Sequence, residues 1–194
     1  MSSTPSGCSD TASLVEEAVQ ARKNSRQLAS ESDVQAALDR IADAARPILE
    51  QENPLVLAVM QGGAFTAVEL CRRFHFPYEF DFIHLTRYGQ SLTGGKVSWR
   101  VLPSLELEGR TVLLVDDILD RGITLAALYD ELDKFRASKL YSAVLVSKNI
   151  EGGEDRTRVD FVGMHIEDAY VFGCGMDYKG YWRGLRALYA VDQS

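Results

Sequence analysis

The stretch VLLVDDILDRGITL, residues 112–125, joins a strand-like run to an unusual group of acids. Its four leading apolar residues are typical of a core strand, and Asp116, Asp117 and Asp120 follow within five positions. Neighbouring carboxylates repel one another, so the end of a buried strand holds them only when a cation or hydroxyl groups balance them. Capping the following helix needs only one acid. The pattern therefore indicates a binding site rather than an ordinary turn.

The second half of this stretch is typical of a phosphate-binding loop. Residues 120–124 are expected to join the strand to a helix, where unpaired backbone N–H groups and the helix dipole favour an anion. Gly122 lets the backbone approach a ligand, and the Thr124 hydroxyl can donate to that ligand. Neither the P-loop pattern nor GxGxxG is present in the sequence. Because Asp116 and Asp117 can hold two ribose hydroxyls or Mg²⁺, the stretch predicts a ribose 5-phosphate site.

Apolar runs alternate with helical periodicity along the chain. Strands are expected at 55–60, 78–85, 96–102, 111–115, 140–147, 159–163 and 170–173. Helices are expected at 11–29, 33–50 and 124–136, with one more after the turn at 62–63. This alternation predicts an α/β fold with a mostly parallel twisted sheet and helices on both faces. Ligands bind beyond the carboxyl ends of such strands, where we expect residues 61–63, 116–124 and 147–148 to meet.

Local signals refine three of these elements. The helix at 33–50 carries a predicted apolar stripe of Val34, Leu38, Ile41, Ala45 and Ile48. Ser32 or Asp33 is the expected N-cap of this helix. Residues 116–123 are expected to form a loop. The strands 78–85 and 96–102 predict a hairpin with a mobile tip at 88–95.

Length and composition limit the class of protein. The 194 residues, 46% of them hydrophobic, suit a single domain over residues 1–194 with a loose segment at 1–10. A net charge of -7 and a pI near 5.0 argue against nucleic acid as a partner. We expect no membrane span and no signal peptide, since no apolar run approaches the roughly 20 residues of a span. Cys8, Cys71 and Cys174 fit no metal motif and favour a reducing, cytoplasmic location.

Residues 112–125 resemble the signature of the type I phosphoribosyltransferases, in which two acids, two apolar residues and a third acid precede a Gly/Thr loop. The third acid of this stretch is Asp120. An aspartate at this position resembles the branch of the family that acts on 6-oxopurines, the hypoxanthine-guanine phosphoribosyltransferases. The resemblance covers residues 33–191 and includes the run DFVGMHIEDAYVFGCGMDYKGYWRGL at 160–185. It implies a small hood, to which the helices within 11–50 contribute, and a flexible hairpin over the site.

The resemblance implies a purine salvage reaction. In the presence of Mg²⁺, the 5-phosphoribosyl group passes from phosphoribosyl pyrophosphate to hypoxanthine or guanine, giving IMP or GMP and pyrophosphate. Asp116 and Asp117 would hold the ribose hydroxyls and Mg²⁺, and Asp120 would face N7 of the purine as general base. The 5-phosphate would lie on the loop of Asp120, Arg121, Gly122, Ile123 and Thr124.

The resemblance places the purine and the pyrophosphate on residues outside this stretch. Lys148 would donate to the 6-oxo group and disfavour the 6-amino group of adenine, which presents only donors. Tyr170 would stack on the base, and Val171 would offer backbone groups to its edge. Asp177 would ligate a second Mg²⁺ ion, and Arg183 would meet the pyrophosphate.

Two positions depart from the family pattern around the pyrophosphate. Many relatives have Lys or Arg before the glycine of the loop after the first strand, where this chain has Gln61 followed by Gly62; the family tolerates a cis peptide there. In the hairpin many relatives have Ser-Tyr, where this chain has Arg87-Tyr88. We hypothesise that Arg87 supplies the cation that Gln61 lacks. Unchanged affinity for phosphoribosyl pyrophosphate in Arg87→Ala would contradict this compensation.

Two alternative functions stay open at the level of sequence. One is a phosphoribosyltransferase that prefers xanthine, because selectivity at the 2-position depends on backbone geometry. The other is a non-catalytic, nucleotide-sensing regulator of the same fold, which would be expected to lose the base-contacting residues or to gain a nucleic-acid module. This sequence keeps Asp120, Lys148, Tyr170 and Asp177. Relatives form dimers or tetramers, so a homodimer or homotetramer is expected.

Overall fold

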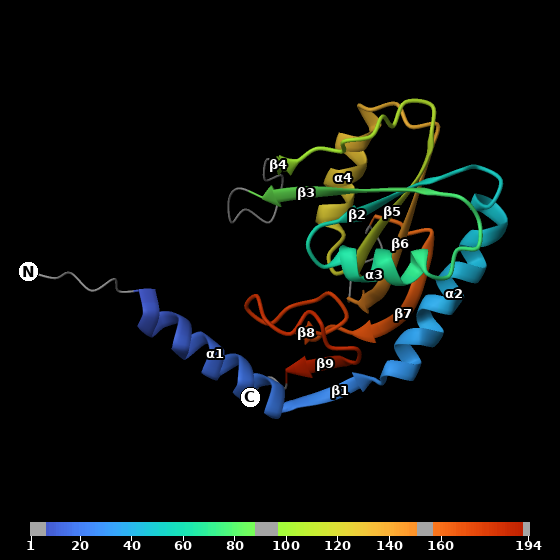
Figure 1. Cartoon of the computed structure of the whole chain (residues 1–194). Helices are drawn as coiled ribbons and strands as arrows, with labels where there is room; N and C mark the ends of the chain where they lie inside the picture. Colours follow the sequence, from blue (N-terminus) through green and yellow to red (C-terminus); the bar gives the residue numbers. More distant parts are fainter. Residues whose placement is uncertain (1–6, 88–96, 151–156, 192–194) are drawn as a thin grey trace, which may run out of the picture.

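The computed structural model describes residues 7–87, 97–150 and 157–191 (Figure 1). Its helices are α1 (Gly7–Lys23), α2 (Glu31–Leu49), α3 (Gly63–Cys71) and α4 (Ile123–Asp133). The larger sheet is formed by β2 (Leu55–Val59), β3 (Glu79–Arg87), β4 (Val97–Val101), β5 (Thr111–Leu119), β6 (Lys139–Asn149) and β7 (Phe161–Glu167). A smaller sheet is formed by β1 (Ser25–Ala29), β8 (Val171–Phe172) and β9 (Leu188–Val191). The expected hairpin tip at 88–95 lies outside the described residues.

The larger sheet has the strand order β4-β3-β2-β5-β6-β7, and only the pair β3 and β4 is antiparallel among these described strands. α2 and α3 pack on one face of the sheet and α4 on the other (Figure 1). The residues of β5 alternate between these faces: Leu113 and Val115 face α2 and α3, whereas Val112 and Leu114 face α4. The predicted mostly parallel sheet with helices on both faces is confirmed. The carboxyl ends of β2, β5 and β6 therefore meet at one edge.

The central strand β5 is longer than its sequence predicts. A loop is expected over 116–123, but residues 116–119 remain in the strand and pair with β6 as far as Leu119 and Ser147. Parallel backbone pairing on this side of β5 stabilises the extension, and β6 likewise runs beyond its predicted end to Asn149. As a result, Asp116 and Asp117 are held on regular strand backbone rather than on a turn.

The N-terminal segment also differs from its prediction. Residues 25–29, expected in a helix, form β1, which pairs antiparallel with β9 from the opposite end of the described chain. Helix α2 begins at Glu31, and its N-cap is Ser30 rather than Ser32 or Asp33. The Ser30 side chain accepts from the backbone N–H of Asp33, while the Asp33 carboxylate accepts from the backbone N–H of Ser30.

Helix α2 packs its apolar stripe on the sheet largely as predicted. Val34, Leu38, Ile41 and Ala45 are buried, but Ile48 is 40% exposed and Leu49 is buried in its place. The 3.6-residue repeat of the helix explains the difference, because Leu49 continues the line of Leu38 and Ala45 more closely than Ile48 does.

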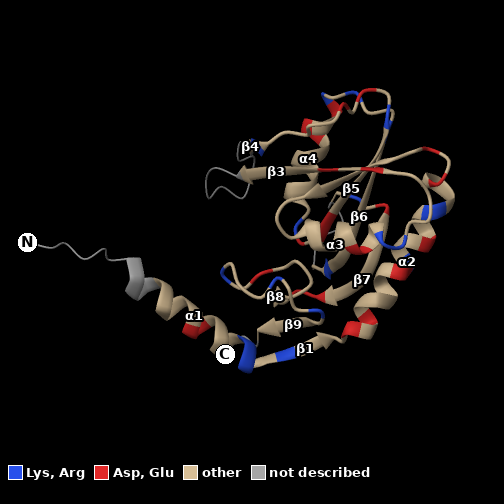
Figure 2. Cartoon of the chain, viewed as in Figure 1, with Lys and Arg blue, Asp and Glu red and all other residues tan. Residues whose placement is uncertain are grey.

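Among the described helices, none concentrates the basic residues (Figure 2). Figure 2 shows acidic and basic residues interspersed along α2 and the loops of the described chain. Within the described ranges, no helix combines the length and the apolar character that crossing a bilayer requires.

Candidate active site

Asp116 and Asp117 lie at the carboxyl edge of the central strand. Asp116 is half-buried and Asp117 is 8% exposed, and the backbone N–H of Asp117 donates to Asp116 Oδ1 at 2.9 Å. Withdrawal from water raises the pKa of both carboxyls, and repulsion from Asp117 adds to the rise at Asp116. Two carboxylates in this state fit a divalent cation or hydroxyl donors, either of which balances their charge.

Asp177, the third predicted metal ligand, is not brought to this pair. Among the described residues, no three or more His, Cys, Asp or Glu side chains are placed to hold one metal ion together. Asp177 Oδ1 instead lies 2.7 Å from Arg183 Nη2, and Asp177 Oδ2 accepts from the Gly180 N–H at 2.6 Å. A donor set of two carboxylates still suits Mg²⁺, which keeps several waters and takes further oxygens from substrate phosphates.

Glycines bring the loop after β2 into direct contact with the acids. A Cβ atom on Gly62 would lie 1.8 Å from Asp117 Oδ2, and one on Gly63 would lie 2.5 Å from the Val115 carbonyl oxygen. Only glycine fits either position without a shift of the loop or the strand. The predicted turn at Gly62 and Gly63 therefore packs on the end of β5, and Gly63 is already the first residue of α3.

Gly175 completes this contact from the opposite side and was not among the predicted site residues. Its φ is +107°, and a Cβ atom there would lie 2.4 Å from the Gly62 carbonyl oxygen. The two glycines of the segment FGCGMD are a signal of close approach, but the sequence does not show what they approach. The peptide between Met60 and Gln61 is cis, as the family resemblance allows.

The predicted phosphate-binding loop follows β5 and opens a cavity of about 380 Å³. The cavity is lined by Asp116, Asp117, Ile118, Leu119, Asp120, Arg121, Gly122, Ile123, Thr124, Leu125 and Val144. Gly122 adopts φ 76° and directly precedes α4, which begins at Ile123, one residue before its predicted start. Gly122 offers no side chain to cap the first turn of α4, and a helix start without a side-chain cap suits an anion. The structure thus brings the predicted 5-phosphate residues around one cavity.

Lys148 is not a solvated surface lysine. Its side chain is only 12% exposed, and its Nζ lies 3.5 Å from Asp120 Oδ1 and 3.4 Å from Asp168 Oδ1. The predicted hydrogen-bond donor and the predicted general base therefore lie side by side, at the ends of two adjacent strands. Asp168 was not among the predicted site residues. In the sequence, only its position near Tyr170 distinguishes it from other surface acids.

Tyr170 and Val171 present the groups that a planar base requires. Tyr170 is 47% exposed, and its ring packs edge-on against Tyr178 with centroids 5.6 Å apart. Val171 is buried in β8, an edge strand of the smaller sheet. Because the Tyr170 carbonyl accepts from the Val191 N–H, the backbone groups of Val171 point to the opposite, unpaired edge. This orientation fits the predicted backbone contacts to a base.

Arg183 connects the loop after β2 with the segment after β8. Its Nη1 donates to the Gly175 carbonyl at 2.7 Å, and its Nη2 lies 3.4 Å from Gln61 Oε1. The positive charge of Arg183 lowers the pKa of Asp117, although burial outweighs this effect. A cation therefore lies beside Gln61, at the position where the sequence lacks one. Arg87 ends β3, but its side chain and the whole of Tyr88 lie outside the described residues, so the compensation by Arg87 stays a hypothesis.

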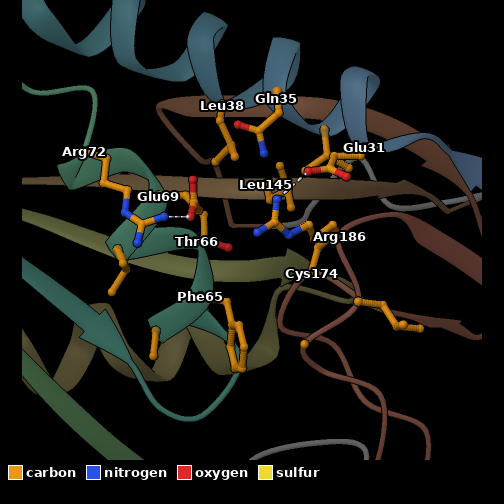
Figure 3. Close-up of a pocket in the computed structure, with 15 residues that line it drawn as sticks. Glu31, Gln35, Leu38, Phe65, Thr66, Glu69, Arg72, Leu145, Cys174 and Arg186 are labelled. Carbon is orange, nitrogen blue, oxygen red and sulfur yellow. Dashed lines mark hydrogen bonds and ion pairs between the residues drawn. The ribbon is translucent and has the colours of Figure 1, made fainter.

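A larger cavity, of about 780 Å³, lies between α2, α3 and residues 184–186, and none of the predicted site residues lines it (Figure 3). Figure 3 shows Arg186 paired with Glu31 and Arg72 paired with Glu69 around it. Cys174 in its wall is 9% exposed, and burial raises the pKa of its thiol to about 12. Cys174 therefore behaves as a small apolar residue.

Strand-end acids, a phosphate cradle and a glycine-lined loop at the carboxyl edge of a parallel sheet define a class of proteins that handle ribose phosphates. Residues 29–179 match the phosphoribosyl transferase domain family, and the chain belongs to this family.

The relatives of the chain narrow this class to the hypoxanthine-guanine branch. The hypoxanthine-guanine phosphoribosyltransferase of Bacillus subtilis is 30% identical over 81% of this chain and 88% of its own length. The hypoxanthine-guanine-xanthine phosphoribosyltransferase of Tritrichomonas foetus is 27% identical over 87% of this chain and 92% of its own length. Among solved structures, the hypoxanthine phosphoribosyltransferase of Trypanosoma cruzi is 30% identical, with a TM-score of 0.80 over 88% of this chain and 97% of that chain. The predicted family is therefore confirmed.

Proposed function

We propose that this enzyme transfers the 5-phosphoribosyl group of phosphoribosyl pyrophosphate to hypoxanthine or guanine, and thereby serves purine salvage. The observation that carries this proposal is the pairing of Lys148 with Asp120 beside the phosphate cradle. An ammonium group and a carboxylate at this spacing suit a 6-oxopurine. The ammonium group can donate to O6, which is a hydrogen-bond acceptor, and the carboxylate can accept from N7, which carries a proton. The names of the relatives support the same substrates.

Different residues of the chain bind the purine, the phosphoribosyl group and the pyrophosphate. Asp120 takes up the proton that the purine nitrogen loses, and Lys148 orients the base through O6. The loop at 120–124 holds the 5-phosphate, while Asp116 and Asp117 hold the ribose hydroxyls. Arg183 faces the pyrophosphate with a positive charge, which stabilises the leaving group as negative charge develops.

Magnesium is the cofactor that the family resemblance implies for this reaction. Asp116 and Asp117 would hold the ion, directly or through water, and Asp177 would contact a second ion after giving up its pairing with Arg183. Bound Mg²⁺ supplies charge stabilisation at the departing pyrophosphate. A cytoplasmic location and the absence of a nucleic-acid partner stay predictions.

A product assay tests the proposed function. The purified protein, Mg²⁺ and phosphoribosyl pyrophosphate are incubated separately with hypoxanthine, guanine, xanthine and adenine, and the nucleotides are separated by chromatography. We expect IMP and GMP to form, with adenine inert because Lys148 faces its 6-amino group with a donor. XMP as the main product would contradict the substrate preference and leave the mechanism in place. Failure of all four bases, with GMP still bound, would favour the regulator.

We further propose that the enzyme is a homodimer that buries the exposed apolar side chains of α3 and β3. Phe65 and Val68 on α3 and Phe80 and Phe82 on β3 are each more than 40% exposed. Phe80 and Phe82 point to the same face of the sheet as α3, because Ile83 points to the face of α4. Apolar groups gathered in this way on one face of the sheet are typical of a protein interface.

The dimer is tested by light scattering coupled to gel filtration. We expect a particle of twice the 21.5 kDa chain mass, and a monomer for Phe82→Glu, because a carboxylate cannot be buried in an apolar interface without a partner. Ile48→Glu places the same change on α2, at a residue that is 40% exposed, and should leave the dimer intact. A monomeric parent protein would contradict the proposed dimer.

A further inference from the structure

Helix α1 precedes the residues that match the family, yet it contacts a segment of the candidate active site. Figure 1 shows α1 running outward from β1, next to β9. The Glu17 carboxylate accepts from the Tyr178 hydroxyl at 3.0 Å and from Lys179 Nζ at 2.5 Å. The Trp182 indole N–H donates to the backbone carbonyl of Ala18 at 2.7 Å. Two adjacent residues of α1, Glu17 and Ala18, therefore contact three residues of the segment 178–182.

This segment connects two residues of the candidate active site, Asp177 and Arg183. The two side chains form an ion pair at 2.7 Å, and the Gly180 N–H closes the turn onto Asp177 Oδ2. Arg183 then reaches the Gly175 carbonyl and also Gln61, which lies in the predicted pyrophosphate loop after β2 (residues 61–63). A displacement of the segment would therefore move the cation that faces the pyrophosphate.

The backbone of the segment depends on external support. Lys179 and Trp182 both have positive φ values, of 50° and 71°, and neither is glycine. Such residues persist in this conformation only when surrounding contacts determine it, because the left-handed region is unfavourable for them. The contacts from Glu17 and Ala18 fall on Lys179 and Trp182 themselves.

Helix α1 is itself anchored next to these contacts. Ala18 is 1% exposed, and the Arg22 guanidinium lies 3.7 Å from the ring centroid of Tyr189 in β9. The hydrogen bonds from Lys179 and Tyr178 lower the pKa of the Glu17 carboxyl. An isolated surface ion pair would stabilise the contact between α1 and the segment 178–182 only slightly. Here the ion pair is combined with an indole hydrogen bond and a buried helix face.

We propose that α1 positions the pyrophosphate-facing turn 177–183 through Glu17 and the Ala18 carbonyl, and that Glu17 is thereby a positioning residue for substrate binding. The proposal rests on the proposed function, since it assigns the pyrophosphate to Arg183. Helix α1 precedes the residues that match the family. The proposal gives this helix a role in substrate affinity rather than in the chemical step.

Charge reversal at Glu17 tests this role. Glu17→Lys places an ammonium against Lys179 and removes both accepted hydrogen bonds. We expect the KM for phosphoribosyl pyrophosphate and the Kd for magnesium pyrophosphate to rise about three- to tenfold, with kcat changed by less than about twofold. Glu16→Lys makes the same change in net charge at an adjacent exposed residue and should change neither constant by more than about twofold.

Trp182 reports on the contact independently of activity. The chain has two tryptophans, so a Trp99→Phe background leaves Trp182 as the only one. In that background, Glu17→Lys should shift the emission of Trp182 to longer wavelength, as expected when an indole becomes more solvated, whereas Glu16→Lys should not. Lys179→Gln removes the same ion pair from the other side, and its effect should not add to that of Glu17→Gln.

The outcomes separate the two proposals. The positioning role would be overturned if Glu17→Lys and Glu16→Lys had the same KM for phosphoribosyl pyrophosphate and the same Kd for magnesium pyrophosphate. A loss confined to kcat would overturn it as well. Additive effects of Glu17→Gln and Lys179→Gln would do the same, and these milder variants keep the test open if charge reversal prevents folding. If the parent protein makes no nucleotide, the proposed function fails. The pyrophosphate affinity and the Trp182 emission would then still decide the role of α1.

Discussion

Replacement of Asp120 by asparagine is expected to lower kcat for hypoxanthine by about 10² to 10⁴, the range that a positioned general base contributes. The substitution keeps the size of the side chain and removes its ability to accept a proton. The KM for phosphoribosyl pyrophosphate should change little, because the proposed contacts to the 5-phosphate come mainly from backbone groups of the loop at 120–124, which lines the cavity after β5. Steady-state kinetics with hypoxanthine and guanine measure both constants.

Asp168 offers a matched control for this prediction. Its carboxylate lies 3.4 Å from Lys148 Nζ, as close as that of Asp120 at 3.5 Å, but it follows a different strand. Each of the substitutions Asp120→Asn and Asp168→Asn removes one of these two carboxylates from beside Lys148. We therefore expect Asp168→Asn to cost less than about tenfold in kcat. Equal losses in the two variants would mean that Asp120 acts only as a counter-ion for Lys148, and the general-base role would be wrong.

The second large effect is expected from a single methyl group. In Gly62→Ala, the new Cβ atom would lie 1.8 Å from Asp117 Oδ2, so either the loop or the carboxylate must move by more than an ångström. Displacements of about this size at a reacting centre cost roughly 10²-fold in rate, and we expect a loss of at least that size in kcat/KM. The loss should appear for both hypoxanthine and guanine, because the loop is proposed to bind the pyrophosphate rather than the base.

Gly184→Ala is the control for this substitution. A Cβ atom on Gly184 meets no other atom within 4 Å, so the variant tests the general effect of the Gly-to-Ala change in the same region of the structure. It should retain activity within about twofold of the parent. Full activity in Gly62→Ala would show that the pyrophosphate loop does not need its contact with Asp117, and that the loop's place in the site is wrong.

The part of the site that could be predicted is the part that is continuous in sequence. Residues 116–124 line one cavity in the structure because a strand end, a tight turn and a helix start bring neighbours together by local geometry alone. Lys148 follows from the parallel order of β5 and β6. Gly175 and Asp168 could not be predicted in the same way, since each depends on how the segment after β7 folds back over the sheet.

The same distinction holds for the fold. The central strands β2, β5 and β6 of the larger sheet are read from apolar runs, because they are buried on both faces and their composition reflects that burial. The segment 25–29 has no such run, and only its pairing with β9 makes it a strand. The wrong prediction of a helix there, and the missed strand β9, have one cause: both strands are defined by a partner far away in the chain.

That partnership also has a consequence for the order in which the enzyme is built during synthesis. β9 lies between β1 and β8, so the smaller sheet can close only after residues 188–191 have left the ribosome. The larger sheet is complete by Glu167 and can fold earlier around its own cores. Contacts between distant segments form late because closing a long loop costs entropy before any pairing repays it. A nascent chain would thus form the proposed ribose-phosphate site before the proposed pyrophosphate-facing turn, and would become a competent enzyme only in its final steps of folding.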